Sequence, residues 1–246
     1  MRMPMCMAAA LVAMLAPVAL DAAVLKLFPV RVELTRDQPV QTMTIENDSD
    51  EPTRVQLRLV AWKQVDGNDV FEETREVLAN PGLFEIGPRG VQIARFGLRT
   101  SPGKTEKAYR VFLEEVPTDR PSLPGEVRTL LRISVPVFVP PAKPVASLNW
   151  RAAPGAAGKI AFTVRNEGNV HIQINRLTLK RVAGGTVPPP QDMSVYLLPG
   201  TTRQVLFDAR DLPRTGEKFK VEAMTDQSDL SVDLVMEAAG REAGRP

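Results

Sequence analysis

Side chains able to carry covalent or acid–base chemistry are scarce in this sequence. It holds one histidine, His171, and one cysteine, Cys6. A nucleophilic relay needs a base beside its nucleophile, and zinc sites use several His or Cys ligands, so neither is supported. Glu114 and Glu115 are neighbours, but adjacent strand residues point to opposite faces and cannot share one proton. The sequence therefore predicts no enzyme, no metal and no cofactor, and we interpret His171 as a structural side chain.

The backbone of one stretch could bind a partner instead. Val127 to Val139 (VRTLLRISVPVFV) is longer than the usual strand of about 10 residues or fewer. Pro136 cannot donate to a sheet, which places that part of the strand on an edge. An unpaired edge invites another chain to add on. Two interpretations follow: a closed sandwich strand that ends at Pro136, or an edge kept open for a client. One face of the strand would present Val127, Thr129, Leu131, Ile133 and Val135.

The start of the chain predicts export. Arg2 and the apolar run Met7 to Leu20 are typical of a secretory signal peptide, which we assign to residues 1–22. No later apolar stretch approaches the ~20 residues that cross a bilayer, so membrane insertion is not expected. The formal net charge of +2 gives no reason to expect a nucleic-acid partner.

Short β-branched segments separated by turn residues predict an all-β protein of immunoglobulin-like sandwiches. The chain contains 22 prolines, and no long amphipathic helical pattern competes with the strands. A stiff proline-rich connection divides the pattern in two, which predicts an L-shaped pair of domains joined at a rigid elbow. The predicted parts are a first domain (23–140), a linker (141–145), a second domain (146–237) and a tail (238–246).

Several phrases, taken in order, resemble the periplasmic chaperones of the chaperone–usher pathway, the PapD-like family. No single phrase is diagnostic, but their order and spacing are, and they cover nearly the whole chain after residue 22. The form RISVPVFV and the lack of a cysteine after Cys6 look more like the archaic, spore-coat-U-associated branch. The matching phrases are Pro29–Val32, Asn80–Phe84, Gly87–Arg95, Tyr109–Pro117, Pro136–Pro140, Asn166–His171 and Leu198–Gly200.

The resemblance implies a function as well as a fold. Family members escort pilus subunits through the periplasm to the outer-membrane usher, and need no nucleotide or other cofactor. Each subunit lacks a strand, and the chaperone lends its own long edge strand, a form of β-augmentation. Here the resemblance implies a donor strand with Val127, Thr129, Leu131 and Ile133 as the inserted residues.

The family also fixes the register of the lent strand. Basic residues between its domains bind the subunit's C-terminal carboxylate by charge-assisted bonds, and Arg31 falls at the position of the anchor arginine. The usual partner, a lysine late in the long strand, is replaced here by Pro136. Arg132 and Arg95 are the candidate substitutes, and Glu115 matches an acidic position that holds the domains together.

Two alternatives from other classes remain. A structural pilus component would carry its donor extension before a single incomplete domain, whereas the donor-like strand here lies inside the first of two. An exported glycan-binding module would need an exposed aromatic platform, and the chain has only two Trp and two Tyr. The sequence does not name the client subunit, and it leaves open whether idle chaperone self-associates to cover its edge.

Overall fold

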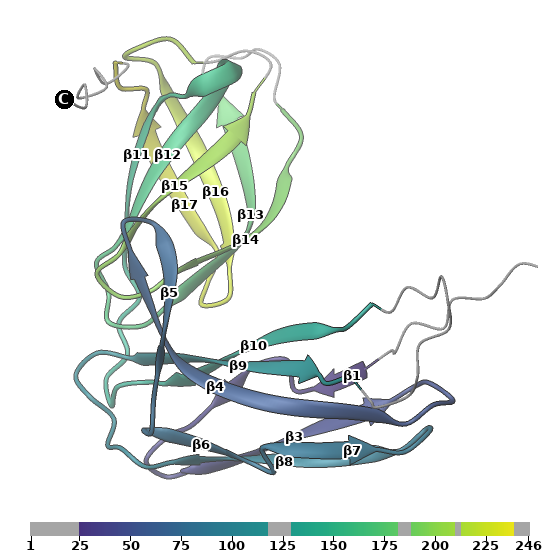
Figure 1. Cartoon of the computed structure of the whole chain (residues 1–246). Helices are drawn as coiled ribbons and strands as arrows, with labels where there is room; N and C mark the ends of the chain where they lie inside the picture. The colour runs from purple at the N-terminus through teal and green to yellow at the C-terminus, as the bar shows by residue number, and fades with distance from the viewer. Residues whose placement is uncertain (1–24, 118–128, 182–187, 210–212, 239–246) are drawn as a thin grey trace, which may run out of the picture.

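The chain folds into two β-sandwich domains that meet at an angle and give the molecule an L-shape (Figure 1). This confirms the predicted all-β fold of two immunoglobulin-like sandwiches. The predicted signal segment lies outside the described residues, as does most of the predicted tail. The computed structural model describes residues 25–117, 129–181, 188–209 and 213–238.

The first domain packs a four-stranded sheet against a six-stranded sheet. The opening stretch of the chain contributes one short strand to each of them. In sheet order, the four-stranded sheet is β1 (Leu25–Phe28), β3 (Val40–Asn47), β8 (Val91–Leu98) and β6 (Val77–Asn80). The six-stranded sheet is β2 (Val32–Glu33), β10 (Arg132–Val139), β9 (Lys107–Glu115), β4 (Thr53–Val65) and β5 (Asn68–Glu73), with β7 (Leu83–Ile86) paired to β4.

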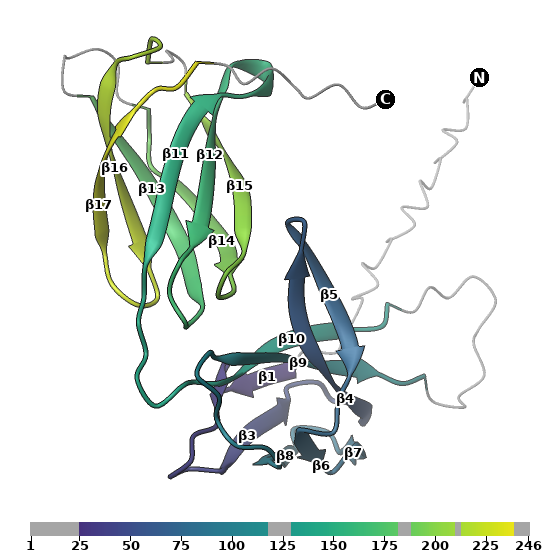
Figure 2. The same ribbon diagram turned by 90° about the vertical axis from the view of Figure 1, so that its left-hand side faces the viewer.

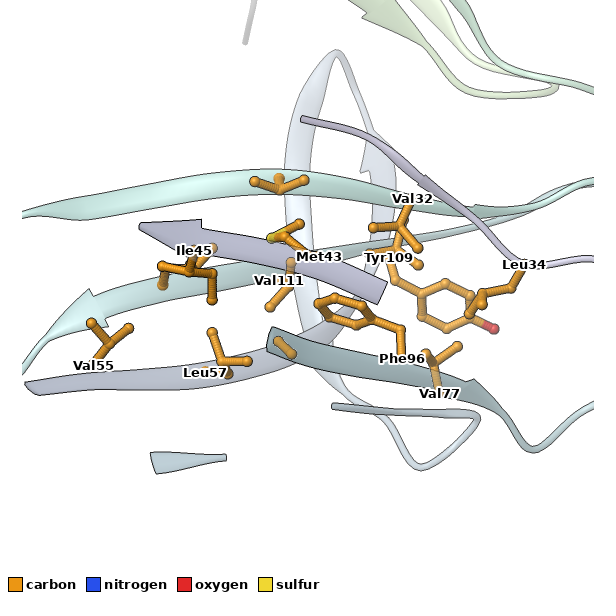
Figure 3. Close-up of a cluster of buried hydrophobic side chains, with 14 of the residues drawn as sticks. Val32, Leu34, Met43, Ile45, Val55, Leu57, Val77, Phe96, Tyr109 and Val111 are labelled. Carbon is orange, nitrogen blue, oxygen red and sulfur yellow. The ribbon is translucent and has the colours of Figure 1, made fainter. Parts of the chain in front are cut away.

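Alternating apolar side chains of both sheets fill the space between them (Figure 3). Met43 and Ile45 come from β3 and Phe96 from β8, and Tyr109 and Val111 face them from β9. All five are at most 1% exposed. Burying such a side chain contributes about 1.5–3 kcal/mol, so this core holds β10 firmly through β9.

A long hairpin, β4–β5, extends beyond the first sandwich toward the second domain (Figure 2). Its turn is Val65-Asp66-Gly67-Asn68. Asp66 has φ 49° and Gly67 φ 75°, the left-handed values that a two-residue hairpin turn of type I′ requires. Asp and Gly tolerate these values, so local sequence alone specifies this element.

The second domain packs a three-stranded sheet against a four-stranded sheet around its own core. A single 3₁₀ turn, η1 (Ala156–Gly158), links its first two strands. In sheet order, the three-stranded sheet is β11 (Leu148–Pro154), β12 (Lys159–Asn166) and β15 (Thr202–Asp208). The four-stranded sheet is β14 (Gln191–Leu197), β13 (Ile172–Arg181), β16 (Lys218–Thr225) and β17 (Leu230–Val235).

The turn after β12 fastens the second domain to the linker and to the first domain. Asn169 receives a hydrogen bond from the backbone N–H of Val145 (2.7 Å) and donates through its amide to the carbonyls of Lys104 (3.1 Å) and Lys143 (3.0 Å). A Cβ on Gly168 would lie 2.2 Å from the Val145 carbonyl oxygen. Only glycine therefore permits this close approach.

Asp69 and Gln64, near the tip of the β4–β5 hairpin, tie it to the second domain, Asp69 through an ion pair with Arg203 and Gln64 through hydrogen bonds of its side chain. Its amide nitrogen donates to the Tyr196 carbonyl (3.0 Å) and to Asp69 (3.0 Å), and its amide oxygen accepts from Leu198 N–H (3.0 Å) and the Thr201 hydroxyl (2.9 Å). Because both the nitrogen and the oxygen of the Gln64 amide form hydrogen bonds to the second domain, the hairpin acts as a strut between the domains.

Each domain contains a buried asparagine at the end of a strand. Asn47 is fully buried and donates to three backbone carbonyls, including those of Ile86 (3.2 Å) and Gly87 (3.1 Å). Asn166 plays the same part in the second domain, where it donates to the carbonyls of Val170 and Leu197. Backbone groups inside a protein must be paired, and these amides pair carbonyls that the sheets leave free.

We expect Asn47→Ala to lower the free energy of unfolding by about 2–4 kcal/mol, because buried carbonyls lose their donor. Urea denaturation of the purified protein measures this loss. Asn68→Ala is the matched control: its amide is exposed and bonds a single carbonyl, so its effect should stay within about 0.5 kcal/mol. Equal effects of the two substitutions would contradict the structural role of Asn47.

Candidate functional site

Strand β10 is paired along its whole length on one side only. β9 pairs with it from Arg132 to Val139, whereas β2 pairs with Val137 and Phe138 alone on the other side. Among the described residues no strand lies beside Arg132 to Pro136 on that second side. An exposed strand edge of this kind can accept a strand from another chain.

The direction of the backbone groups on this edge follows from two hydrogen bonds. Leu131 O accepts from Glu115 N–H on β9 (2.9 Å), and Phe138 O accepts from Leu34 N–H on the opposite side (2.8 Å). Alternate residues of a strand direct their N–H and C=O to opposite sides. Ser134, four residues before Phe138, therefore directs both of its groups to the open side.

Pro136 lies where the cover by β2 stops. It has the same orientation as Ser134 and Phe138, so an N–H at this position would point to the open side. Proline has no N–H, so its presence at this position removes no hydrogen bond between β10 and β9. The groups left for a partner are the N–H and C=O of Arg132 and Ser134, because the parallel pairing of Val137 with Val32 directs the C=O of Pro136 to the N–H of Val32.

The two faces of β10 carry different side chains. Ile133 is half-buried and packs against the core of the first domain, and Val135 is buried there. Arg132 and Ser134 are exposed on the opposite face. The apolar face of the open edge is thus continuous with the core, so a strand added beside β10 would extend both the sheet and its apolar layer.

The structure shortens the predicted strand. β10 begins at Arg132 and not at Val127, because β9 ends at Glu115 and offers no further ladder. Thr129 is exposed and Leu131 is half-buried in the segment just before the strand. Of the four predicted donor residues, only Ile133 lies in β10, and Val127 lies outside the described residues.

Arg31 lies between β1 and β2 and reaches across to the second domain. Its guanidinium bonds Asp226 (2.7 Å) and the Gln173 side chain (2.9 Å) and lies 5.7 Å from the centre of the Phe138 ring. Burial alone would lower the pKa of Arg31, but hydrogen bonding with Tyr196 and the charge of Asp226 outweigh it and raise the pKa. The side chain remains 27% exposed, so a ligand can still reach it.

Arg110 is a second cation at this end of β10 that sequence reasoning missed. It sits on β9 directly opposite Pro136, and the parallel pairing of β2 with β10 brings Arg31 level with the same position. Its guanidinium stacks on the Trp62 ring at 3.9 Å and lies 5.0 Å from the Tyr196 ring. No carboxylate of the described residues pairs with it.

Electrostatics sets Arg110 apart from the other arginines of the first domain. Burial lowers the pKa of Arg110, and the nearby Tyr196 and the charge of Asp69 offset only part of this effect, while the positive charge of Arg31 adds to it. A half-buried cation without an ion-pair partner gains most from an incoming anion. The sequence signal was Arg110 itself, in an outward position of a strand, but pairing it with Pro136 required the register between two strands.

The two candidate substitutes for the missing lysine lie elsewhere. Arg95 is exposed on β8, in the four-stranded sheet, where it pairs with Thr42. Arg132 bonds Glu114 (3.1 Å) and stands four residues before Pro136, about 13 Å along a strand. The structure thus brings neither of them to Arg31.

Glu115 does not lie at the domain junction, contrary to its predicted interdomain role. Its carboxylate accepts from Leu131 N–H (3.1 Å) at the end of β9 that pairs with the start of β4. Glu106, just before the other end of β9, makes the interdomain contact instead. Its carboxylate accepts from the backbone N–H of His171 (2.8 Å).

His171 is a buried member of this junction. Its ring stacks on Phe138 with 3.5 Å between centroids, and its two nitrogens face Glu106 (2.7 Å) and Asp226 (3.0 Å). Arg31, Asp226, His171 and Glu106 therefore form a chain of alternating basic and acidic side chains across the two domains. Both ring nitrogens are occupied in this way, which leaves the imidazole no free position for attack on a substrate.

The described parts of the chain hold no cluster of three or more potential metal-ligating side chains. They also contain no helix with the length and apolarity needed to cross a bilayer.

Residues 24–144 match the family described as pili and flagellar-assembly chaperone, PapD N-terminal domain. A search of curated protein sequences found no significant match.

Solved chaperone structures share the fold over most of the chain. A chain of the Acinetobacter baumannii CsuC–CsuE chaperone–tip adhesion subunit complex, from archaic chaperone–usher Csu pili, is 17% identical with a TM-score of 0.63, covering 89% of this chain and 100% of that one. A chain of the Salmonella enterica SafA pilin–SafB chaperone complex is 17% identical with a TM-score of 0.60, and the match covers 89% of this chain and 99% of that one. The E. coli chaperone DraB is 21% identical with a TM-score of 0.56, and the match covers 88% of this chain and 98% of that one.

Proposed function

Residues 24–144 belong to the PapD N-terminal domain family of pilus-assembly chaperones, and from this membership we propose that the chain binds, folds and caps pilus subunits before their assembly. The family consists of non-enzymatic chaperones. Both domains have the fold of solved pilus chaperones, including chaperones held in complexes with a pilin or a tip subunit. The chain is thus a chaperone of the chaperone–usher class.

The observation that carries this proposal is the open edge of β10 from Arg132 to Pro136. A subunit that lacks a strand can pair its own backbone with this edge. Ile133 and Leu131, with Thr129 and Val127 before them, are the proposed donor residues that enter the subunit's groove. Each apolar side chain contributes about 1.5–3 kcal/mol when fully buried, less the cost of ordering and docking.

Arg31 and Arg110 are the proposed anchor for the subunit's C-terminal carboxylate. They flank Pro136 from the two neighbouring strands, at the end of the open edge. A carboxylate held by two guanidinium groups through charge-assisted bonds fixes where strand pairing starts. In this proposal Arg110 takes the place of the family lysine, and Arg132 and Arg95 no longer serve as substitutes.

The cellular setting follows the family. We propose that the chain acts in the periplasm after removal of residues 1–22, and that it passes its subunit to an outer-membrane usher. Membership of the archaic branch stays a prediction, as does self-association of idle chaperone through the edge of β10.

Neither alternative function gains support from the described residues. A glycan platform built on Trp or Tyr needs these rings exposed, but Trp62, Trp150 and Tyr109 are all buried. A pilus component would carry its donor strand before its domain, whereas β10 is built into the first domain between β9 and β2.

Co-expression in the periplasm with the pilus subunit encoded beside this chain tests the proposal. We expect a one-to-one complex, and subunit that is degraded or aggregated when the chaperone is omitted. The yield of folded subunit and the mass of the purified complex are the measurements. Subunit that accumulates equally with and without the chaperone would refute the proposed function.

A further inference from the structure

The anchor residue Arg31 is already engaged in the structure. Asp226 holds it at 2.7 Å, and the Asp226 side chain is only 9% exposed. A subunit carboxylate that takes over this guanidinium must compete with Asp226. Leaving Asp226 buried without its partner would be costly, so another group must keep its charge compensated.

His171 is placed to do this. Its Nε2 lies 3.0 Å from the same Asp226 oxygen that Arg31 binds, and its Nδ1 lies 2.7 Å from Glu106. Histidine and Glu106 are 2% and 3% exposed. A neutral imidazole has one N–H and could satisfy only one of the two carboxylates, whereas the imidazolium donates to both.

The remaining surroundings contain few charges. The ring stacks on Phe138, and the Tyr196 ring lies 6.1 Å away. Arg31 reaches the site through Asp226, and Arg110 lies beyond Tyr196. Burial alone would lower the pKa of His171, but the bonds to Asp226 and Glu106 outweigh it and raise the pKa.

Resting on the proposed function, we propose that His171 is a positioning residue for subunit capture. As the imidazolium it keeps Asp226 paired when Arg31 turns to the subunit's carboxylate, so that protonation of His171 and subunit binding favour each other. The incoming carboxylate is the third beside those of Asp226 and Glu106, and the three negative charges are then balanced by the three cations Arg31, His171 and Arg110.

Linkage makes this coupling measurable from either side. If protonation strengthens subunit binding by a given factor, binding must raise the affinity of His171 for its proton by the same factor. We expect the pKa of His171 to be about one unit higher in the complex, which corresponds to tenfold in affinity. Subunit affinity should accordingly be greatest below the pKa of free chaperone and decline as pH rises through the pKa of the complex.

The experiment uses the fact that the chain has one histidine. Full-length mature chaperone with a histidine-free tag is labelled with ring ¹⁵N-histidine, and unlabelled denatured pilus subunit, the probe, is diluted into it to form the complex. NMR titration from pH 5 to pH 10 then follows His171 alone, free and bound. A histidine with a merely structural role would titrate equally in both states.

Asp226→Asn is the matched variant, because its side-chain oxygen can still accept from Gln173 N–H while the charge shared by Arg31 and His171 is lost. Its His171 should show no difference in pKa between free and bound chaperone. If this variant does not fold, the comparison of free and bound wild-type chaperone is sufficient to test the coupling. A complex in which the pKa of wild-type His171 is unchanged or lower overturns the coupling alone. Failure to form any complex overturns the proposed function together with it.

Discussion

Replacing Ser134 with proline is expected to weaken subunit capture on the order of 100-fold while the chaperone stays folded. The N–H of Ser134 points to the open side of β10, so its loss breaks no bond to β9. In the complex, a client carbonyl would lose its donor and meet the proline ring. A lost bond and an unsatisfied buried carbonyl together cost about 2–4 kcal/mol, or roughly 30- to 1000-fold in affinity.

The dissociation rate of the purified complex measures this effect, and thermal unfolding of the free variant checks the fold. Ser134→Ala is the control, because it removes the same hydroxyl but keeps the N–H, and it should bind like the wild type. If proline and alanine behave alike, the backbone of this edge does not pair with the subunit, and strand donation through β10 is wrong.

The second large effect is expected at the anchor. Arg110→Gln removes a half-buried cation that has no ion-pair partner among the described residues. Truncating one member of a buried, hydrogen-bonded charge pair costs about 2–5 kcal/mol, so subunit affinity should fall on the order of 100-fold. Equilibrium competition between wild-type and variant chaperone for a limiting amount of subunit measures the loss.

Two further variants locate the effect. Arg110→Lys keeps the charge but lacks the planar fork that binds a carboxylate through two bonds, so an intermediate loss is expected. Arg132→Gln changes an exposed arginine at the other end of the open edge and should alter affinity by less than about threefold. A loss at Arg132 as large as that at Arg110 would place the carboxylate anchor at the Arg132 end of the open edge instead.

Local features of the sequence predicted much of the fold. The β4–β5 turn needs left-handed backbone at Asp66 and Gly67, and these residue types supply it. Met43 and Ile45 alternate with polar residues along β3, as Val55 and Leu57 do along β4, and all four lie inside the first core. Such features depend on neighbours in the chain, which is why one sequence is enough to predict them.

The site depended on contacts between distant segments. That Arg110 stands opposite Pro136 follows from the register of β9 and β10, which residue types alone do not reveal. Glu115 is the last residue of β9 and Glu106 immediately precedes the strand, and only the position of the second domain shows that Glu106 is the interdomain residue. The sequence overestimates β10 at its N-terminal end, because the apolar alternation begins before Arg132, where β9 no longer offers a strand to pair with.

The strut formed by Gln64 has a kinetic consequence. Because the β4–β5 hairpin and the Asn169 turn already connect the domains, the angle between them is set before any subunit arrives. Binding then requires no domain closure, so the association rate should be governed by encounter and by the zippering of the subunit along β10. Interfaces that are formed in advance associate faster than those that must first rearrange. A nascent subunit that aggregates when left exposed would thus meet a chaperone that is ready at first contact.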